Sequence, residues 1–398
     1  MNGRVGIWLI GAKGGVASTA ILGLAALQKK LVPSNALVSC LPEFENLGMA
    51  GWDDFVVGGH EIRDVRLYDE VMRMAVQNRI AAPTLVEQCR AELDAIDARI
   101  RPGTLQNVGP AIAALAAPSV PREETPRQVL DRLTADMAAF VESERLAHLV
   151  VVNVSSTEPP VDTAGLPTVW AEFEQQMDGQ AGRRLPASSL YAIASLNAGH
   201  SYLNFTPSLG PALPAINELA LLRRTRYYGC DGKTGETLMK SVLAPMFARR
   251  NLHVLSWVGH NIFGNMDAQV LDDPANKQAK VASKDHLVGE ILGYRPQTLV
   301  SIERIDDMGD WKTAWDHIHF SGFLGLPMTL QFIWQGCDSA LAAPLVLDLV
   351  RFTELAYRRK HVGTMPFLSS FFKSPYGITE HSFDRQYRKL EEWAKEEA

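Results

Sequence analysis

Apolar residues in the first half of the chain come in short unbroken runs bounded by glycine or polar residues. The run RVGIWLI (4–10) is typical of a parallel strand buried on both faces. We expect further strands at ALVSC (36–40), DFVVGG (54–59), HLVVVNV (148–154) and SYLNF (201–205). Helical patterns fill the intervals, over residues 17–28, most of 63–146 and 188–198. This alternation predicts an α/β fold with a Rossmann-type doubly wound parallel sheet.

The pattern changes after about residue 237. A helical pattern over 238–250 and a strand at 252–258 are followed by three more strand-like segments, QTLVSIERI (297–305), AWDHIHFSG (314–322) and MTLQFIWQG (328–336). Together they predict an open, mostly antiparallel sheet, and helices return at 338–357 and 383–395. We therefore expect three parts: a Rossmann-type domain over 1–237, an inserted α+β open-sheet domain over 238–345, and a segment over 346–398 that returns to the first domain.

A glycine turn joins the first strand to the first helix. Gly11, Gly14 and Gly15, followed by Val16 and Ala17, stand where backbone N–H groups would hold the pyrophosphate of a dinucleotide. An ATPase loop is the rival interpretation of KGGVAST (13–19), but Ala17-Ser18 replace the Gly-Lys that such a loop needs. Past the strand at 54–59, Glu61 is the expected ligand of the ribose hydroxyls, with Glu43 as the alternative.

Composition narrows the class of protein. The chain has 398 residues, 46% of them hydrophobic, and a net charge of −6, which gives no support for binding nucleic acid or an anionic membrane. Its four cysteines are scattered without a Cys-x-x-Cys pair, as in proteins of a reducing compartment. No signal peptide or membrane-spanning run is evident. We expect a cytoplasmic globular protein.

Four lysines stand in unusual contexts. Lys280 and Lys284 are four residues apart in AKVASK, Lys312 lies in GDWKTAWD, and Lys373 is the one charge in FLSSFFKSP. An ammonium group among apolar residues is costly unless it meets an anion, and two lysines on one helical face repel each other. The lysines therefore predict an anionic substrate.

Several motifs occur in the same order as in the myo-inositol-1-phosphate synthase family, which the chain resembles over most of its length. They are the glycine turn, WDDFVVGGHEIRD (52–64), SSTEP (155–159), DGKTGETLMKSVL (231–243), HNIFGNMD (260–267), GDWKTAWD (309–316), CDSALAAPLVLDLV (337–350) and FLSSFFKSP (367–375). The resemblance implies an isomerase with catalytic NAD, usually a homotetramer. Such an enzyme cyclises a hexose 6-phosphate by oxidation at C5, enolisation at C6, an intramolecular aldol reaction and reduction. It also implies that the inserted domain carries catalysis and subunit contacts.

The resemblance assigns roles to residues of this chain. Active-site positions fall on Lys280, Lys284, Lys312, Lys373, Asp231, Asp267 and Asp338, and Asp231 with Lys233 forms a DxK motif. Cofactor positions fall on Gly11, Gly14, Gly15, Val16, Ala17, Glu61, Ser156, Thr157, Asp267, Asp338 and Ser339. Positions that bind the substrate phosphate fall on Thr234, Gly235, Glu236, Asn265 and Lys280.

Departures from the family pattern leave the substrate open. Glu236 stands where a glutamine commonly helps to bind phosphate, and GGHEI replaces GGWDI. We expect glucose 6-phosphate giving myo-inositol 1-phosphate. The alternatives are fructose 6-phosphate giving a five-membered cyclitol phosphate, and a non-catalytic NAD-binding homologue. His260 is a weaker substrate-contact candidate, and the pair His317 and His319 has no evident third ligand, so no metal site is predicted.

Overall fold

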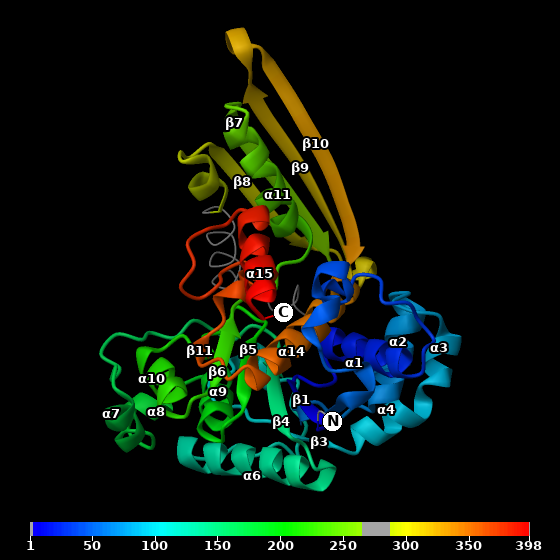
Figure 1. Ribbon diagram of the computed structural model, residues 1–398, viewed down its shortest axis with the longest axis vertical. Helices are drawn as coiled ribbons and strands as arrows, with labels where there is room; N and C mark the ends of the chain where they lie inside the picture. Colours follow the sequence, from blue (N-terminus) through cyan, green and yellow to red (C-terminus); the bar gives the residue numbers. More distant parts are fainter. Residues whose placement is uncertain (1–2, 265–286, 398) are drawn as a thin grey trace.

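The computed structural model describes residues 3–264 and 287–397 (Figure 1). The predicted site residues Asn265, Asp267, Lys280 and Lys284 lie outside the described residues. No helix in the described part of the chain is long and apolar enough to cross a membrane.

A seven-stranded sheet, parallel throughout, forms the larger part of the molecule. Its strand order is β11-β6-β5-β4-β1-β2-β3, so β1 and β4 are neighbours at its middle. The strands are β1 (Val5–Ile10), β2 (Phe55–Glu61), β3 (Ile100–Pro102), β4 (His148–Asn153), β5 (Ser201–Asn204), β6 (Arg226–Gly229) and β11 (Gly363–Thr364). Every residue of β1, β2 and β4 is buried, which explains their unbroken apolar sequences.

Helices cover both faces of this sheet, and the predicted Rossmann-type architecture is confirmed. One face packs against α1 (Gly15–Gln28), α2 (Leu67–Gln77), α3 (Pro83–Gln88), α4 (Arg90–Asp97), α14 (Asp338–Arg358) and α15 (Phe383–Glu397). The other packs against α5 (Pro110–Ala113), α6 (Pro126–Glu144), α7 (Trp170–Gln175), α8 (Gln180–Arg183), α9 (Ala187–Asn197) and α10 (Pro214–Leu222). Alternate residues of β1 point to opposite clusters, Ile7 and Leu9 to one and Trp8 to the other.

A second sheet has the order β10-β9-β7-β8. It contains β7 (His253–Phe263), β8 (Gln297–Arg304), β9 (Trp311–Ser321) and β10 (Pro327–Cys337). Strand β9 is antiparallel to both neighbours, and β7 and β8 are parallel. Helix α11 (Gly235–Arg249) covers one face, where Phe247, Trp257 and Ile318 are buried together. The hairpin of β9 and β10 extends away from the body (Figure 1).

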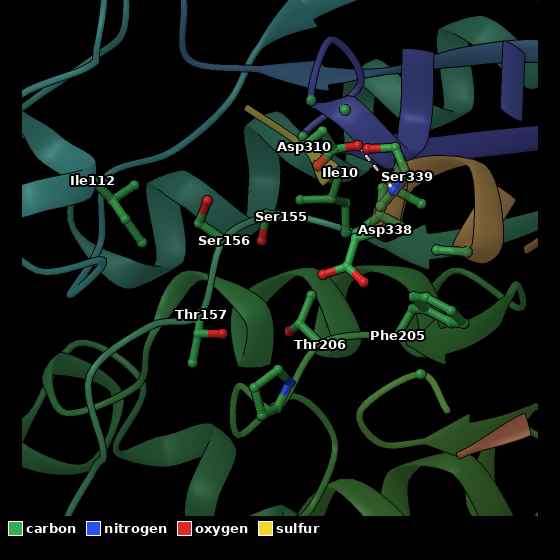
Figure 2. A pocket seen from close by; sticks show the side chains of 18 of the residues that line it. Ile10, Ile112, Ser155, Ser156, Thr157, Phe205, Thr206, Asp310, Asp338 and Ser339 are labelled. Carbon is green, nitrogen blue, oxygen red and sulfur yellow. Dashed lines mark hydrogen bonds between the residues drawn. The ribbon is translucent and has the colours of Figure 1, made fainter. Parts of the chain in front are cut away.

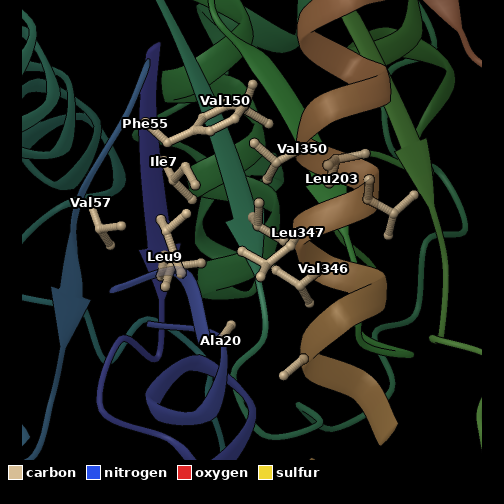
Figure 3. Packing of buried hydrophobic residues seen from close by; sticks show 14 of the residues in the cluster. Ile7, Leu9, Ala20, Phe55, Val57, Val150, Leu203, Val346, Leu347 and Val350 are labelled. Atoms are coloured by element: carbon tan, nitrogen blue, oxygen red, sulfur yellow. The ribbon is translucent and has the colours of Figure 1, made fainter. Parts of the chain in front are cut away.

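The chain returns from this sheet to the large one through α14. This helix begins at Asp338, directly after β10, and packs beside α1. Figure 3 shows Val346, Leu347 and Val350 of α14 against Ile7 and other residues of the strands. The first and last parts of the sequence therefore share one core.

One strand prediction was wrong. Residues 36–40 were expected to form a strand, but Val38–Cys40 is a 3₁₀ turn. The N–H groups of Val38 and Ser39 each donate to the carboxylate of Asp348 on α14, both at 2.8 Å, instead of to a neighbouring strand. The short strands β3, β6 and β11 were not predicted, and β7 continues five residues beyond the expected end at 258, to Phe263.

Candidate active site

A cavity of about 680 Å³ lies where the carboxyl ends of the large sheet meet the small sheet. Its lining includes Gly11 and Ser155, which follow β1 and β4, and Asp231, Lys312 and Lys373 on the opposite side. Figure 2 shows Ser155, Ser156 and Thr157 on one side of it and Asp338 and Ser339 nearby. Ligands of doubly wound sheets bind at such a crevice, between neighbouring strands whose connections leave in opposite directions.

The glycine turn is shaped by close backbone contacts. Gly11 has φ +78°, and a Cβ atom there would lie 2.9 Å from the Cα atom of Ser155. Its N–H and that of Ala12 donate to the carbonyl of His60, at 2.9 and 3.0 Å. Gly14 is the N-cap of α1 and supplies no side-chain cap, which leaves N–H groups of the first turn for a ligand.

The other predicted residues of this turn divide into two groups. Gly15 and Val16 line the cavity, and a Cβ at Gly15 would lie 2.5 Å from the Oγ of Ser339. Ala17 is fully buried and does not line it. The side chain of Lys13 also turns away, because its Nζ lies 2.7 Å from Asp97 on α4. The turn therefore offers backbone groups and no ammonium, unlike an ATPase loop.

Glu61 ends β2 and lines the cavity, with its carboxylate held by the backbone. The N–H groups of Lys13 and Ile62 donate to it at 2.8 Å, and that of Arg63 at 3.1 Å. The Arg63 guanidinium lies 3.5 Å away and offsets part of its charge. Glu61 is thus fixed at the strand end where a cofactor ribose is expected.

The turn after β4 contains a buried acid that the sequence interpretation missed. The predicted site residues Ser156 and Thr157 line the cavity, and Glu158, which is 6% exposed, lines it as well. The Ser188 N–H donates to Glu158 at 2.8 Å, and the Ser188 hydroxyl donates to its other oxygen. Burial raises the pKa of Glu158 to about 7, although these hydrogen bonds oppose the shift.

Asp231 and Lys373 form an ion pair across the cavity from the glycine turn, with 2.8 Å between Nζ and Oδ1. A short antiparallel ladder brings them together: the Lys373 N–H donates to the Asp231 carbonyl at 2.7 Å, and Gly232 is bridged to Phe372. Burial opposes the charge on Lys373, but Asp231 outweighs it, and the pKa of Lys373 is raised. This lysine is therefore an ammonium at neutral pH.

A second, looser pair comes from the small sheet and α14. Lys312 Nζ lies 3.6 Å from Asp338 and 5.0 Å above the ring of Phe263. Asp338 is the first residue of α14, and Cys337 takes the N-cap position that Asp338 could have filled. Asp310, which the sequence interpretation also missed, accepts from the Ser339 N–H at 3.0 Å and fixes this helix start. Its signal was its place in the same GDWKTAWD motif as Lys312.

The predicted phosphate residues lie at the start of α11. Thr234 is the N-cap and lines the cavity, while Gly235 has φ +49° and does not line it. Glu236 also lines the cavity, but its carboxylate lies 2.6 Å from Lys240 Nζ and accepts from Asn261 at 2.7 Å. Its charge is therefore offset by the buried ammonium group of Lys240.

The histidine candidates lie elsewhere. His260 stacks on Trp315 at 5.6 Å between ring centroids and bonds Ser301, and it does not line the cavity. His317 and His319 are partly exposed on β9. Among the residues that the structure describes, no group of three or more His, Cys, Asp or Glu side chains could hold a metal ion.

A family model described as myo-inositol-1-phosphate synthase matches residues 38–395. The chain belongs to this family. The resemblance drawn from the motifs is confirmed, and the seven-stranded parallel sheet with its four-stranded companion is the family's fold.

Individual relatives extend the match over nearly the whole chain. Inositol-3-phosphate synthase 1 of Bacteroides thetaiotaomicron is 29% identical over 409 residues, covering 96% of this chain and 91% of that protein. Inositol-3-phosphate synthase 1 of Bos taurus is 30% identical over 86% of this chain, which spans 60% of that longer protein.

Two crystal structures have the same fold. Inositol-3-phosphate synthase of Caenorhabditis elegans superposes with a TM-score of 0.88 at 23% identity, covering 100% of this chain and 86% of that one. A myo-inositol-1-phosphate synthase-related protein of Thermotoga maritima gives 0.79 at 24% identity and covers 98% of both chains.

Proposed function

We propose that this protein is an isomerase that cyclises a hexose 6-phosphate with catalytic NAD. The observation that carries the proposal is one cavity in which the glycine turn meets two lysine–carboxylate pairs, Asp231–Lys373 and Lys312–Asp338. A dehydrogenase needs the first feature, and an enolate intermediate needs the second. Family membership supports the combination.

The residues around the turn fit a dinucleotide. The cradle at Gly11 admits no Cβ, and the first N–H groups of α1 lack a side-chain cap. Its pyrophosphate would rest on the backbone of Gly11, Gly14, Gly15 and Val16, with Glu61 at the adenosine ribose and Ser156, Thr157, Asp338 and Ser339 toward the nicotinamide. When bound, NAD would accept a hydride from C5 of the sugar and return it after ring closure. The carboxylate of Glu61 disfavours a 2′-phosphate, so NAD should bind more tightly than NADP.

The paired lysines supply the electrostatic part of the reaction. Lys373, charged and anchored by Asp231, stabilises the negative oxygen that develops when C6 is deprotonated and when the ring closes. Lys312, beside Asp338, holds a second positive charge on the small-sheet side. Lys280 and Lys284 are proposed to act with them, and Asp267 to lie near the nicotinamide, by family correspondence alone. The N-terminus of α11, from Thr234 and Gly235, would bind the phosphate together with Asn265 and Lys280.

Glucose 6-phosphate is the substrate that we propose, giving myo-inositol 1-phosphate. The test is to incubate the protein and NAD⁺ separately with glucose 6-phosphate and fructose 6-phosphate, and to identify the dephosphorylated products by NMR. Inositol from glucose 6-phosphate is expected, and Lys373→Met is the inactive control. If only fructose 6-phosphate reacts and gives a branched cyclopentane polyol, the proposed substrate is wrong and the proposed reaction sequence stands. No product from either sugar, with no NAD binding by calorimetry, would leave a non-catalytic homologue.

We also propose that residues 238–345 make the subunit contacts of a homotetramer. The face of the small sheet away from α11 exposes Ile333 (69%) and Leu299 (55%), and the β9–β10 turn exposes Phe323 (88%) and Leu324 (89%). Exposed apolar residues on one face of a sheet and its adjoining turn are typical of a subunit interface. Light scattering should show four chains for the natural protein and fewer for Ile333→Asp. An unchanged mass for that variant would contradict this interface. The boundaries of the proposed domains, 1–237, 238–345 and 346–398, remain a proposal.

A further inference from the structure

A second lysine lies buried behind the Asp231–Lys373 pair. Lys233 is 2% exposed, and it does not line the cavity. Its Nζ donates to the amide oxygen of Gln386 on α15, and Gln386 is itself fully buried. Within residues 3–264 and 287–397, no carboxylate lies within ion-pair distance of Lys233. A buried ammonium with a neutral acceptor is unusual, because burial strongly penalises an uncompensated charge.

The backbone ties Lys233 to the catalytic pair. The Lys233 N–H donates to the Phe371 carbonyl at 2.8 Å, in the same ladder that joins Asp231 to Lys373. The amide of Gln386 is oriented by its own donation to the Glu380 carbonyl, at 2.5 Å, which turns its oxygen toward the lysine. The position of Lys233 is therefore fixed from two sides.

The charges around Lys233 come from two directions. Lys373 and Asp231 lie on its own ladder. The segment before α15 brings His381, which lies 2.5 Å from Glu290, and Glu380, whose carboxylate pairs with Arg385 at 2.9 Å. Burial, reinforced by the charge of Lys373, lowers the pKa of Lys233 to about 7. In the ligand-free protein, both forms of this lysine are thus populated near neutral pH.

We propose that Lys233 is a positioning residue that takes up a proton from solvent when the anionic sugar phosphate fills the cavity. A second ammonium group then adds to the positive potential that Lys373 provides at the cavity. The inference rests on the proposed function, since it needs an anionic substrate. A phosphate dianion makes the local potential more negative, which favours the charged form of a nearby lysine. The enolate intermediate is also negatively charged, so Lys233 stays protonated during the reaction.

Thermodynamic linkage fixes the sign of the pH effect. A ligand that favours the protonated lysine binds most tightly where Lys233 is already protonated, below about pH 7, and loses affinity as pH rises. The loss between pH 7 and pH 8.5 should be on the order of tenfold for a group that binds one proton. Above pH 7 the substrate phosphate is already a dianion before it binds. Protons taken up on binding are therefore taken up by groups of the protein.

The experiment is calorimetric titration of the NADH-loaded protein with glucitol 6-phosphate, which has no carbonyl for NADH to reduce. Measurements at pH 8 in two buffers of different ionisation enthalpy give the number of protons taken up. The natural protein should take up about one proton. Lys233→Met should take up about one proton fewer and bind weakly at every pH. Lys395→Met, which changes an exposed lysine on α15, the helix that contains Gln386, is the matched control and should behave like the natural protein.

A second variant separates charge from structure. Gln386→Glu gives Lys233 a carboxylate partner that keeps it protonated, at the expense of the bond to the Glu380 carbonyl. It should also lose the proton uptake, yet bind tightly up to pH 8.5, the opposite of Lys233→Met. If both variants take up as many protons as the natural protein, or if the natural protein binds without uptake, the inference is wrong. If glucitol 6-phosphate does not bind at all, the proposed function fails with it.

Discussion

The two sides of the cavity are built in different ways. On the proposed cofactor side, the turns after β1 and β4 present backbone groups and small side chains, and each turn is one continuous stretch of chain. On the proposed substrate side, charged side chains come from three distant segments, around Asp231, Lys312 and Lys373. The first side therefore depends on the local backbone conformation of two turns, and the second depends on charged side chains that the fold brings together.

This difference determines how each side affects the stability of the folded protein. Backbone N–H groups at a helix start carry no net charge, so they can be gathered at one place without like-charge repulsion. Gathered lysines repel each other, and the two that line the cavity are each accompanied by an acid: Asp231 beside Lys373 and Asp338 beside Lys312. Single substitutions should therefore have distinct effects, on cofactor affinity for one side and on turnover for the other.

The largest effect is expected at Lys373. Lys373→Met keeps the volume and removes the charge that would stabilise the enolate, so turnover should fall by about 10³-fold. The affinity for NAD⁺, measured by calorimetry, should change little. Because the substitution leaves Asp231 without its partner, the double variant Asp231→Asn/Lys373→Met serves as the control for stability. Near-normal turnover in either variant would contradict the assigned role.

The same contrast explains what the sequence could and could not predict. The strands at 4–10, 54–59 and 148–154 and the glycine turn are local patterns, and they were placed correctly. Residues 36–40 were mistaken for a strand because the carboxylate that binds their N–H groups, Asp348, lies some 300 positions away in sequence. Lys373 was singled out by its apolar neighbours and Asp231 by the family resemblance, but their pairing was not predicted, since no local pattern joins them.

The missed residues have a common cause. Glu158 and Asp310 are polar residues that resemble surface positions in the sequence, and only the fold shows that they are buried. Lys233 was named in the sequence as part of a DxK motif, but its burial was missed for the same reason. Each stands within two residues of a predicted site residue. The sequence could therefore have pointed to these residues by their closeness to a motif, but it could not show that they are buried.

Glu158, a buried acid on the proposed cofactor side, should affect stability more than chemistry. The raised pKa of Glu158 means that its protonated form is favoured in the folded state, so stability is present at acid pH and falls as pH rises from about 4.5 to about 7. The loss should be about 3 kcal/mol. Glu158→Gln should remove that slope in denaturant unfolding measured from pH 4.5 to 8. The exposed Glu172→Gln is the control, and an equal slope in all three proteins would contradict the assignment.

A backbone substitution should harm the cofactor side selectively. Gly11→Ala places a Cβ atom 2.9 Å from the Ser155 backbone at φ +78°, which should displace the turn and weaken NAD⁺ binding by about 30-fold. Turnover at saturating NAD⁺ should be nearly normal. Gly199→Ala is a matched control, because Gly199 has φ +87° with open space around it and lies away from the cavity. If both variants bind NAD⁺ like the natural protein, the turn is not the pyrophosphate site.

The smallest effect is expected at the looser ion pair. Lys312 lies 3.6 Å from Asp338, and its side chain remains 18% exposed, so water shares in solvating the charge. A pair of this kind contributes less than the ladder-anchored Asp231–Lys373 pair, and Lys312→Met should lower turnover by about tenfold. Steady-state rates at several salt concentrations make the comparison sharper, because the activity of the natural protein should decline with salt more than that of Lys312→Met. A loss as large as that of Lys373→Met would show that Lys312 touches the reacting oxygen directly, and the two pairs would then be equal partners in the reaction.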